Sequence, residues 1–215
     1  MKKTILLFSA LLIFGNLSAQ DKAALVNPII GTNGMGHTFP GACVPFGLVQ
    51  LSPDTDTIPH NVDGKYQPRA YEYCAGYQHK DSSIVGFSHT HFSGTGHSDL
   101  GDILIMPATG ELKLNPGTAT DPDGGYRSRF SHDTEVSRPG YYEVMLADYG
   151  VKAQLTATKR VGVHKYTFPK EAKNQRIILD MIHGIYNYDG KVLWTNIRVE
   201  NDTLVTGYRI TNGWA

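Results

Sequence analysis

Apolar and polar residues alternate in short runs along the second half of the chain. In residues 151–158 apolar side chains occupy the odd positions and polar side chains the even positions, a period typical of a strand that buries one face. Comparable runs recur about every ten residues, which predicts an antiparallel β-sandwich. The predicted strands cover residues 141–148, 151–158, 161–168, 176–182, 191–199 and 203–210.

The first half of the chain has a different pattern. Residues 44–51 and 103–106 are predicted strands, and long loops rich in glycine, proline and histidine separate them. No stretch after residue 20 sustains a helical hydrophobic period over three turns, so little helix is expected. The fold class predicted is all-β, with one domain over residues 20–215.

The amino terminus has the features of a Sec signal peptide. Lys2 and Lys3 precede an apolar segment at residues 5–14, and a run of mostly small residues ends at Ala19, so residues 1–19 are predicted to be cleaved. The apolar segment is about half the ~20 residues that a membrane span needs. No cysteine follows Ala19, which argues against a lipoprotein anchor at this place.

The charge balance narrows the class of partner. The chain has 20 basic and 20 acidic residues, and the signal peptide contains two of the lysines and no acid, so the mature chain has a net charge of −2. Such a balance provides neither a basic footprint for nucleic acid nor a polybasic membrane surface. An uncharged or small partner is therefore expected.

Cys43 and Cys74 are the two cysteines of the chain. An oxidising compartment would permit a disulfide between them, closing a loop of about thirty residues. Two buried thiols, or a direct chemical role for one of them, are the alternatives.

Two loops have the composition of ligand-binding segments. The glycine-rich loop at residues 31–47 includes His37 and Phe39; its glycines would let the backbone approach a ligand closely, although a structural crossover is the plainer interpretation. It lacks the Lys and Ser/Thr of a phosphate-binding P-loop. The loop at residues 86–99 contains His89 and His91, which would share one face of an extended segment, with His97 and Asp99 beyond them.

The histidines of this second loop allow two interpretations. A transition-metal site built on His89, His91 and His97 is one, but their spacing matches no strong zinc signature. Hydrogen bonding to a sugar or within the structure is favoured. The nearby Tyr66, Tyr71, Tyr73 and Tyr77, followed by Phe87 and Phe92, would suit the C–H faces of a sugar ring, with at least half of these rings expected in the core.

Several long motifs in one order resemble the amino-terminal domain of glycoside hydrolase family 92. Together they extend over essentially the whole mature chain, which makes the likeness specific. The motifs are VNPIIGT (26–32), the stretch at 36–54 ending in QLSPD, Gly76-Tyr77, GFSHTHFSGTG (86–96), YRSRFSH (126–132), RPGYY (138–142) and LTATKRVGVH (155–164).

The resemblance implies a calcium-dependent, exo-acting, inverting α-mannosidase that bacteria secrete to the periplasm or cell surface, acting on mannose-containing glycans. Members of this family place their active site between an amino-terminal β-sandwich and an (α/α)6 barrel that would begin beyond Ala215. The catalytic carboxylates and most calcium ligands would lie in that barrel. No catalytic residue or metal ligand is therefore assigned in this chain, and the chain alone is predicted to be inactive.

The predicted substrate-binding residues are His37, Phe39, Tyr71, Cys74, His89 and His91. Members selective for α-1,2-linked mannose have a tryptophan three residues before the cysteine of this motif, where this chain has Tyr71, so the linkage stays open. A stand-alone carbohydrate-binding or structural module is the alternative function, followed by a small metalloenzyme built on the histidines of the second loop.

Overall fold

The computed structural model describes residues 21–94 and 100–213, so the predicted signal peptide and residues 95–99, with His97 and Asp99, lie outside the described part. Strands are the main regular secondary structure of the described residues, and the helices among these residues are short 3-10 turns. The prediction of an all-β chain with little helix is confirmed. The turns are η1 (Lys22–Leu25), η2 (Pro68–Tyr73), η3 (Pro122–Gly124) and η4 (His132–Thr134).

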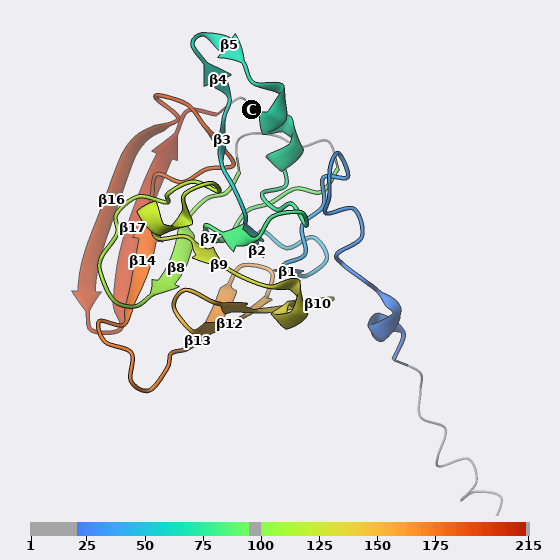
Figure 1. Cartoon of the computed structure of the whole chain (residues 1–215), viewed down its shortest axis with the longest axis vertical. Coiled ribbons are helices and arrows are strands. Elements are labelled where there is room, and N and C mark those ends of the chain that lie inside the picture. Colours follow the sequence, from blue (N-terminus) through green and yellow to red (C-terminus); the bar gives the residue numbers. More distant parts are fainter. Residues whose placement is uncertain (1–20, 95–99, 214–215) are drawn as a thin grey trace, which may run out of the picture.

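Two antiparallel sheets pack against each other to form the body of the sandwich (Figure 1). The larger sheet has the order β1 (Ala42–Cys43), β2 (Gln50–Asp54), β7 (Gly86–Ser88), β8 (Leu104–Ala108) and β14 (Arg176–Asp180). The second sheet has the order β10 (Val136–Arg138), β11 (Tyr141–Leu146), β12 (Val151–Ala157) and β13 (Gly162–Thr167).

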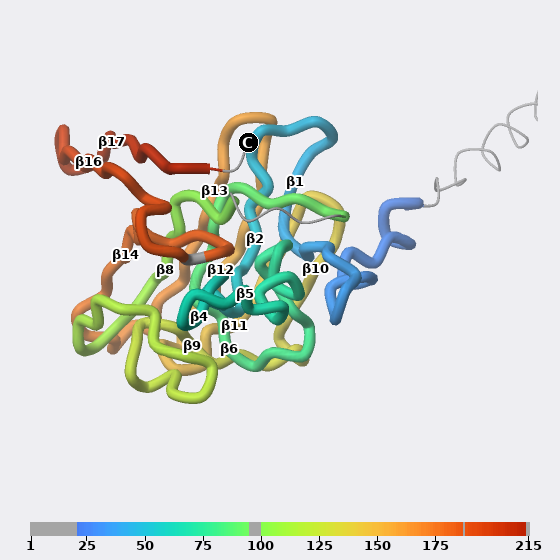
Figure 2. The backbone as a smooth tube through the Cα atoms, turned by 90° about the horizontal axis from the view of Figure 1, so that it is seen from above, coloured from blue at the N-terminus to red at the C-terminus, as the bar shows by residue number. Residues whose placement is uncertain are grey.

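Four two-stranded pairs surround this body. The longest is a hairpin that extends from one flank of the molecule (Figure 2). The pairs are β16 (Val192–Asn201) with β17 (Leu204–Thr211), β4 (Asn61–Val62) with β5 (Lys65–Tyr66), β6 (Ser83–Ile84) with β9 (Ser128–Arg129), and the parallel pair β3 (Ile58–Pro59) with β15 (Tyr186–Asn187).

The core lies between the two sheets, and β12 contributes to it as predicted. Val151, Ala153, Leu155 and Ala157 are buried, whereas the residues between them are partly or fully exposed. In register, Leu155 lies between Tyr142 of β11 and His164 of β13. The alternation in the sequence therefore identified both the strand and its buried face. The opposing sheet contributes Leu51, Phe87, Leu104 and Met106 to the same core.

The predicted strand at residues 44–51 is wrong over most of its length. A turn occupies its first half, in which the Gly47 N–H donates to the carbonyl of Val44 at 2.9 Å. Phe46 adopts a φ of 56° and points its ring into solvent. Pro45 also lacks the N–H that a ladder needs. The strand β2 consequently begins only at Gln50.

Candidate functional site

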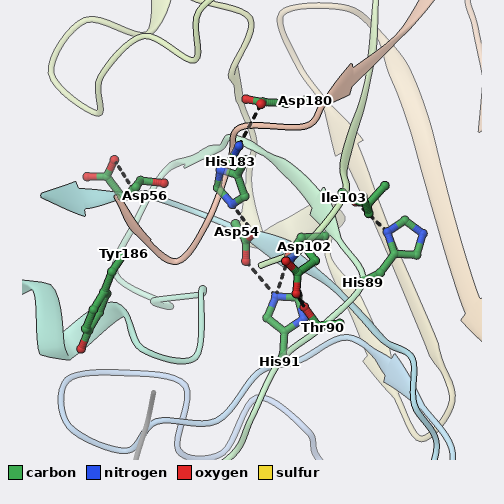
Figure 3. A network of polar contacts seen from close by, with 12 residues as sticks. Asp54, Asp56, His89, Thr90, His91, Asp102, Ile103, Asp180, His183 and Tyr186 are labelled. Carbon is green, nitrogen blue, oxygen red and sulfur yellow. Dashed lines mark hydrogen bonds and ion pairs between the residues drawn. The ribbon is translucent and has the colours of Figure 1, made fainter. Parts of the chain in front are cut away.

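A buried carboxylate joins three segments that are distant in the sequence (Figure 3). The two oxygens of Asp54, at the end of β2, lie 2.8 Å from Nε2 of His91 and 2.7 Å from Nε2 of His183. All three side chains are almost fully buried. Burial alone would raise the pKa of Asp54, but the charge of His91 and the hydrogen bonds from both imidazoles outweigh it, so the pKa lies well below its usual range.

A glycine makes room for this network. Gly76 has a φ of 82°, and a Cβ atom built on it would lie 2.1 Å from Asp54 Oδ1 and 3.1 Å from the His91 ring. Both features restrict the position to glycine. Because Gly76 has no side chain, the segment that follows η2 can lie directly against the buried carboxylate of Asp54.

His91 uses both ring nitrogens inside the protein. Its Nδ1 lies 2.7 Å from the carbonyl oxygen of Gln50, which can only accept, and its Nε2 faces the Asp54 carboxylate. Nδ1 must therefore hold an N–H, while Nε2 lies between the Asp54 carboxylate and the Ser88 hydroxyl, which is 3.1 Å away. Its ring lies 5.3 Å from that of Phe39 between centroids. His91 thus supports the side of the site on which Phe39 lies.

His37 is strained, buried and incompletely hydrogen-bonded. Its backbone has a φ of 51°, and its side chain packs edge-on to Tyr71 with 4.6 Å between the ring centroids. The residue is only 6% exposed, yet Nε2 has no partner among the described residues. Strain and an unsatisfied polar atom in one residue are features of ligand-binding positions.

The glycine-rich loop around His37 is fixed at both ends. The Gln78 side-chain amide accepts from the Gly34 N–H at 2.8 Å and donates to the Gly34 carbonyl at 2.9 Å. On the other side the Gly94 N–H donates to the His37 carbonyl at 2.8 Å. The loops at residues 31–41 and 86–94 are therefore held together next to η2.

Tyr71 lines an open cavity of about 1260 Å³ between the β4–β5 hairpin and the segments around residues 186–192 and 212–213. Tyr66, Tyr186 and Tyr188 also line it, together with His60. By contrast Tyr73, Tyr77 and Phe87 are buried. The expectation that at least half of the aromatic cluster is core holds, and Tyr66 and Tyr71 are the members that reach a ligand-sized space.

Cys74 lies below Tyr71, fully buried in a small cluster with Ala70, Ile185 and Tyr186. No disulfide joins it to Cys43, which is half-buried in β1. Burial raises the pKa of the Cys43 thiol. Of the alternatives considered for the two cysteines, the structure therefore agrees with two thiols and not with a disulfide. Cys74 packs under the cavity wall.

The structure separates His89 from the other five predicted site residues. His89 Nδ1 donates to the carbonyl of Ile103 at 2.7 Å, and its Nε2 lies 3.1 Å from Nε2 of His164 on β13. Burial lowers the pKa of both imidazoles, that of His164 to about 3. They form a neutral pair between the sheets. The expectation that His89 and His91 share one face is wrong, because the chain leaves the strand after Ser88 (Figure 3).

Sequence reasoning did not identify Asp54, His183 or Gln78. Asp54 stands in the quoted motif at 36–54, but its partner His183 is 129 residues away. Nothing in the local pattern indicates that pairing. Gln78 directly follows the Gly76-Tyr77 motif, so its position could have been noticed. The two hydrogen bonds of its side-chain amide to Gly34, called the Gln78 clasp below, could not have been predicted.

The described residues therefore form a β-sandwich with two fixed loops and an aromatic cavity at one edge. Residues 25–215 match the glycosyl hydrolase family 92 N-terminal domain, and the chain belongs to this family. An uncharacterized secreted glycosidase from Arthroderma benhamiae is 30% identical over 158 residues, which cover 69% of this chain and 18% of that protein.

Two solved structures extend the comparison. The family GH92 α-mannosidase BT3965 from Bacteroides thetaiotaomicron, in complex with mannoimidazole, is similar with a TM-score of 0.78 and 47% identity, covering 89% of this chain and 23% of that chain. The inverting mannosidase BT2199 from the same species has a TM-score of 0.60 and 26% identity, covering 91% and 24%. This chain thus spans about a quarter of those structures.

Proposed function

We propose that this chain is the amino-terminal, substrate-binding part of a secreted, exo-acting, inverting α-mannosidase that removes terminal mannose from glycans. Its family membership and its likeness to structures named as α-mannosidases support the glycosidase class. The proposed partners are mannose-containing glycans and an (α/α)6 barrel following residue 215. Among the described residues no helix is both long and apolar enough to cross a membrane, and we propose an extracellular or periplasmic location.

The unsatisfied Nε2 of His37 is the observation that carries the binding role. A buried ring nitrogen without a partner costs free energy of about 1–3 kcal/mol unless a ligand satisfies it. A sugar hydroxyl can donate to or accept from an imidazole nitrogen. Tyr71, packed edge-on to this ring, offers at the cavity the apolar surface on which the C–H face of a sugar lies.

The proposed mechanism assigns the acid–base chemistry to residues outside this chain. Inversion needs two carboxyl groups about 6.5–9.5 Å apart, one of which must hold a proton near neutral pH. Asp63 and Asp189 are the acidic residues that line the cavity, and both are exposed. Neither has the buried, apolar surroundings in which glycoside hydrolases place the carboxyl group that acts as an acid. Asp54 is committed to two imidazoles and is kept ionised.

Calcium remains a proposal for the longer protein. This cation takes six to eight oxygen ligands, several of them carboxylates. Among the described residues the one cluster of three possible ligands contains two histidines and a glutamate, a set that does not fit calcium. No step is therefore derived through calcium, and the proposed ligands lie mainly outside this chain.

Mannose release from an α-linked mannobiose tests the division of labour. We expect the gene product extended by its barrel to release mannose and the 215-residue chain, after export, to release none. Release by the 215-residue chain alone would contradict the proposal. Micromolar binding of mannose by this chain without hydrolysis would instead favour the stand-alone carbohydrate-binding module.

A further inference from the structure

Three side chains with metal-binding atoms gather at η4. His79 lies in the segment between η2 and β6. His132 is the first residue of η4, and Glu135 comes directly after the last residue of η4. One ligand atom from each lies within 4.8 Å of the other two. His132 Nδ1 is 2.7 Å from the Glu135 carboxylate.

Backbone hydrogen bonds hold the three residues in place. The His79 N–H donates to the carbonyl of Thr32 at 2.8 Å, and the Glu135 N–H donates to that of His132 at 3.1 Å. The Ser131 side chain caps the turn by accepting from the Asp133 N–H at 3.2 Å. The ligand atoms are therefore brought together by folding rather than by a flexible tail.

The Glu135 carboxylate has the surroundings of an oriented metal ligand. Its side chain is only 3% exposed. The Tyr77 hydroxyl donates to its oxygens at 2.9 and 3.0 Å, and the Tyr142 hydroxyl donates at 2.6 Å. Such outer hydrogen bonds fix the orientation of carboxylates that bind metals.

The two imidazoles leave the charge of this carboxylate only partly balanced. Among the described residues its single ion-pair partner is His132. The ring of His79 lies 4.0 Å from that of His132 between centroids, with 36° between the planes. A divalent ion bound by both imidazoles and the carboxylate would balance the charge of Glu135.

We propose that His79, His132 and Glu135 bind a divalent transition-metal ion, with Zn²⁺ as the preferred ion. Two nitrogens and one oxygen are a ligand set that zinc accepts, with a water molecule in the fourth position. The His132 side chain is 37% exposed, which leaves a path for the ion from solvent. The ion would tie the segment at residues 77–79 to η4 and, through Tyr142, to β11.

Titration calorimetry of the metal-free chain, produced without a histidine tag, tests the site with ZnCl₂ and separately with CaCl₂. We expect one Zn²⁺ per chain, no competition by Ca²⁺, and a higher melting temperature with Zn²⁺. His132→Ala and His79→Ala should each weaken binding at least 100-fold, more than Tyr142→Phe, for which a loss of about 10- to 100-fold is expected.

Asp133→Asn, on the same turn but outside the cluster, and His60→Ala, an imidazole elsewhere, are the matched controls and should bind Zn²⁺ as the parent chain does. Substituting Co²⁺ should give the visible absorption of a tetrahedral site, which His132→Ala removes. His132 is exposed, so this variant should fold. No stoichiometric binding, or binding that the His79 and His132 variants leave unchanged, would overturn the proposal without affecting the mannosidase assignment.

Discussion

At the scale of single residues, the pairing of Asp54 with His91 and His183 decides which groups remain available to a ligand. His91 has both ring nitrogens engaged inside the protein, so it can meet a ligand only through the face or edge of its ring. Under the proposed function, its role is to position the ring of Phe39. His37 is different, because one of its nitrogens is still unsatisfied. The two histidines consequently have separate tests.

Replacing Asp54 by asparagine should destabilise the fold by about 2 kcal/mol or more, because two buried imidazoles would lose the carboxylate that they share. Urea denaturation measures this difference. Asp63→Asn is the matched control, since Asp63 is exposed, and should change the free energy of unfolding by less than about 0.5 kcal/mol. A loss below about 1 kcal/mol for Asp54→Asn would contradict a structural contribution from this buried network.

Histidine 164 should make stability depend on pH. Its pKa is about 3 in the folded protein and ~6.5 in an unfolded chain. Between these values the unfolded chain binds a proton that the folded chain does not, so the free energy of unfolding decreases as the pH falls from about 6.5 toward 3. Denaturation midpoints across this range should decrease less steeply for His164→Gln than for the parent or for His60→Gln. Equal slopes would contradict the neutral pair with His89.

The strain at His37 can be separated from its binding role. His37→Gly should relieve the positive φ, and the gain should roughly offset the greater backbone entropy of glycine, leaving stability within about 1 kcal/mol of the parent. Mannose affinity, measured by calorimetry on the barrel-containing protein, should fall because the ring nitrogen is lost. A large loss of stability, or unchanged affinity, would argue that His37 is only structural.

At the scale of elements, the sequence pattern predicts the strands from 141 onward, because each buries one face and short turns separate them. It fails at residues 44–51, where apolar residues belong to a turn containing Phe46 at positive φ. Hydrophobicity alone does not distinguish an apolar turn from a strand. Pro45 and Gly47 are residues that favour turns, and they were the better indication of the structure at this place.

Strand β12 permits a direct test of the buried face. Leu155→Ala removes a fully buried side chain from the core and should cost about 2–5 kcal/mol. Lys165→Ala on the neighbouring strand β13 changes an exposed position and should cost less than about 0.5 kcal/mol. Chemical denaturation of both variants compares them. Similar losses of unfolding free energy in the two variants would mean that the buried face of β12 is not the main contribution of this sheet to stability.

The sequence suggests candidate site residues only where they lie in loops with a marked composition. The sequence indicates His37, Phe39 and Tyr71 as ligand-facing residues because glycine and tyrosine cluster around them. It cannot indicate that Asp54 pairs with His183, because folding brings the two segments together. The same limit applies to the cluster of His79, His132 and Glu135. In the sequence His79 is more than fifty residues from the other two, so only folding brings it to them.

At the scale of the whole molecule, the β16–β17 hairpin leaves an unusual amount of apolar surface exposed. Leu193, Trp194, Val199, Tyr208 and Ile210 are each about half exposed or more, and the hairpin pairs with no further strand among the described residues. Exposed apolar patches of this kind mark interaction surfaces or favour aggregation. We propose that the following part of the longer protein covers this surface.

The 215-residue chain should therefore self-associate and bind a hydrophobic fluorescent dye. Trp194→Lys with Val199→Lys should reduce both effects, whereas Lys165→Ala, on the sandwich, should not. Analytical ultracentrifugation over a concentration series measures the association. A monodisperse parent chain at high concentration would contradict this account of the hairpin.

The clasp that Gln78 makes on Gly34 affects how a ligand would bind. Since the clasp fixes the loop of His37 during folding, a sugar arriving beside Tyr71 would immobilise little additional backbone. The entropy lost on association would then come mainly from the sugar and the displaced water. In Gln78→Ala the loop of His37 would be free before binding, and ordering it would add to the entropy lost on association. Binding should therefore be weaker and its entropy more unfavourable, although the contacts made in the complex stay the same.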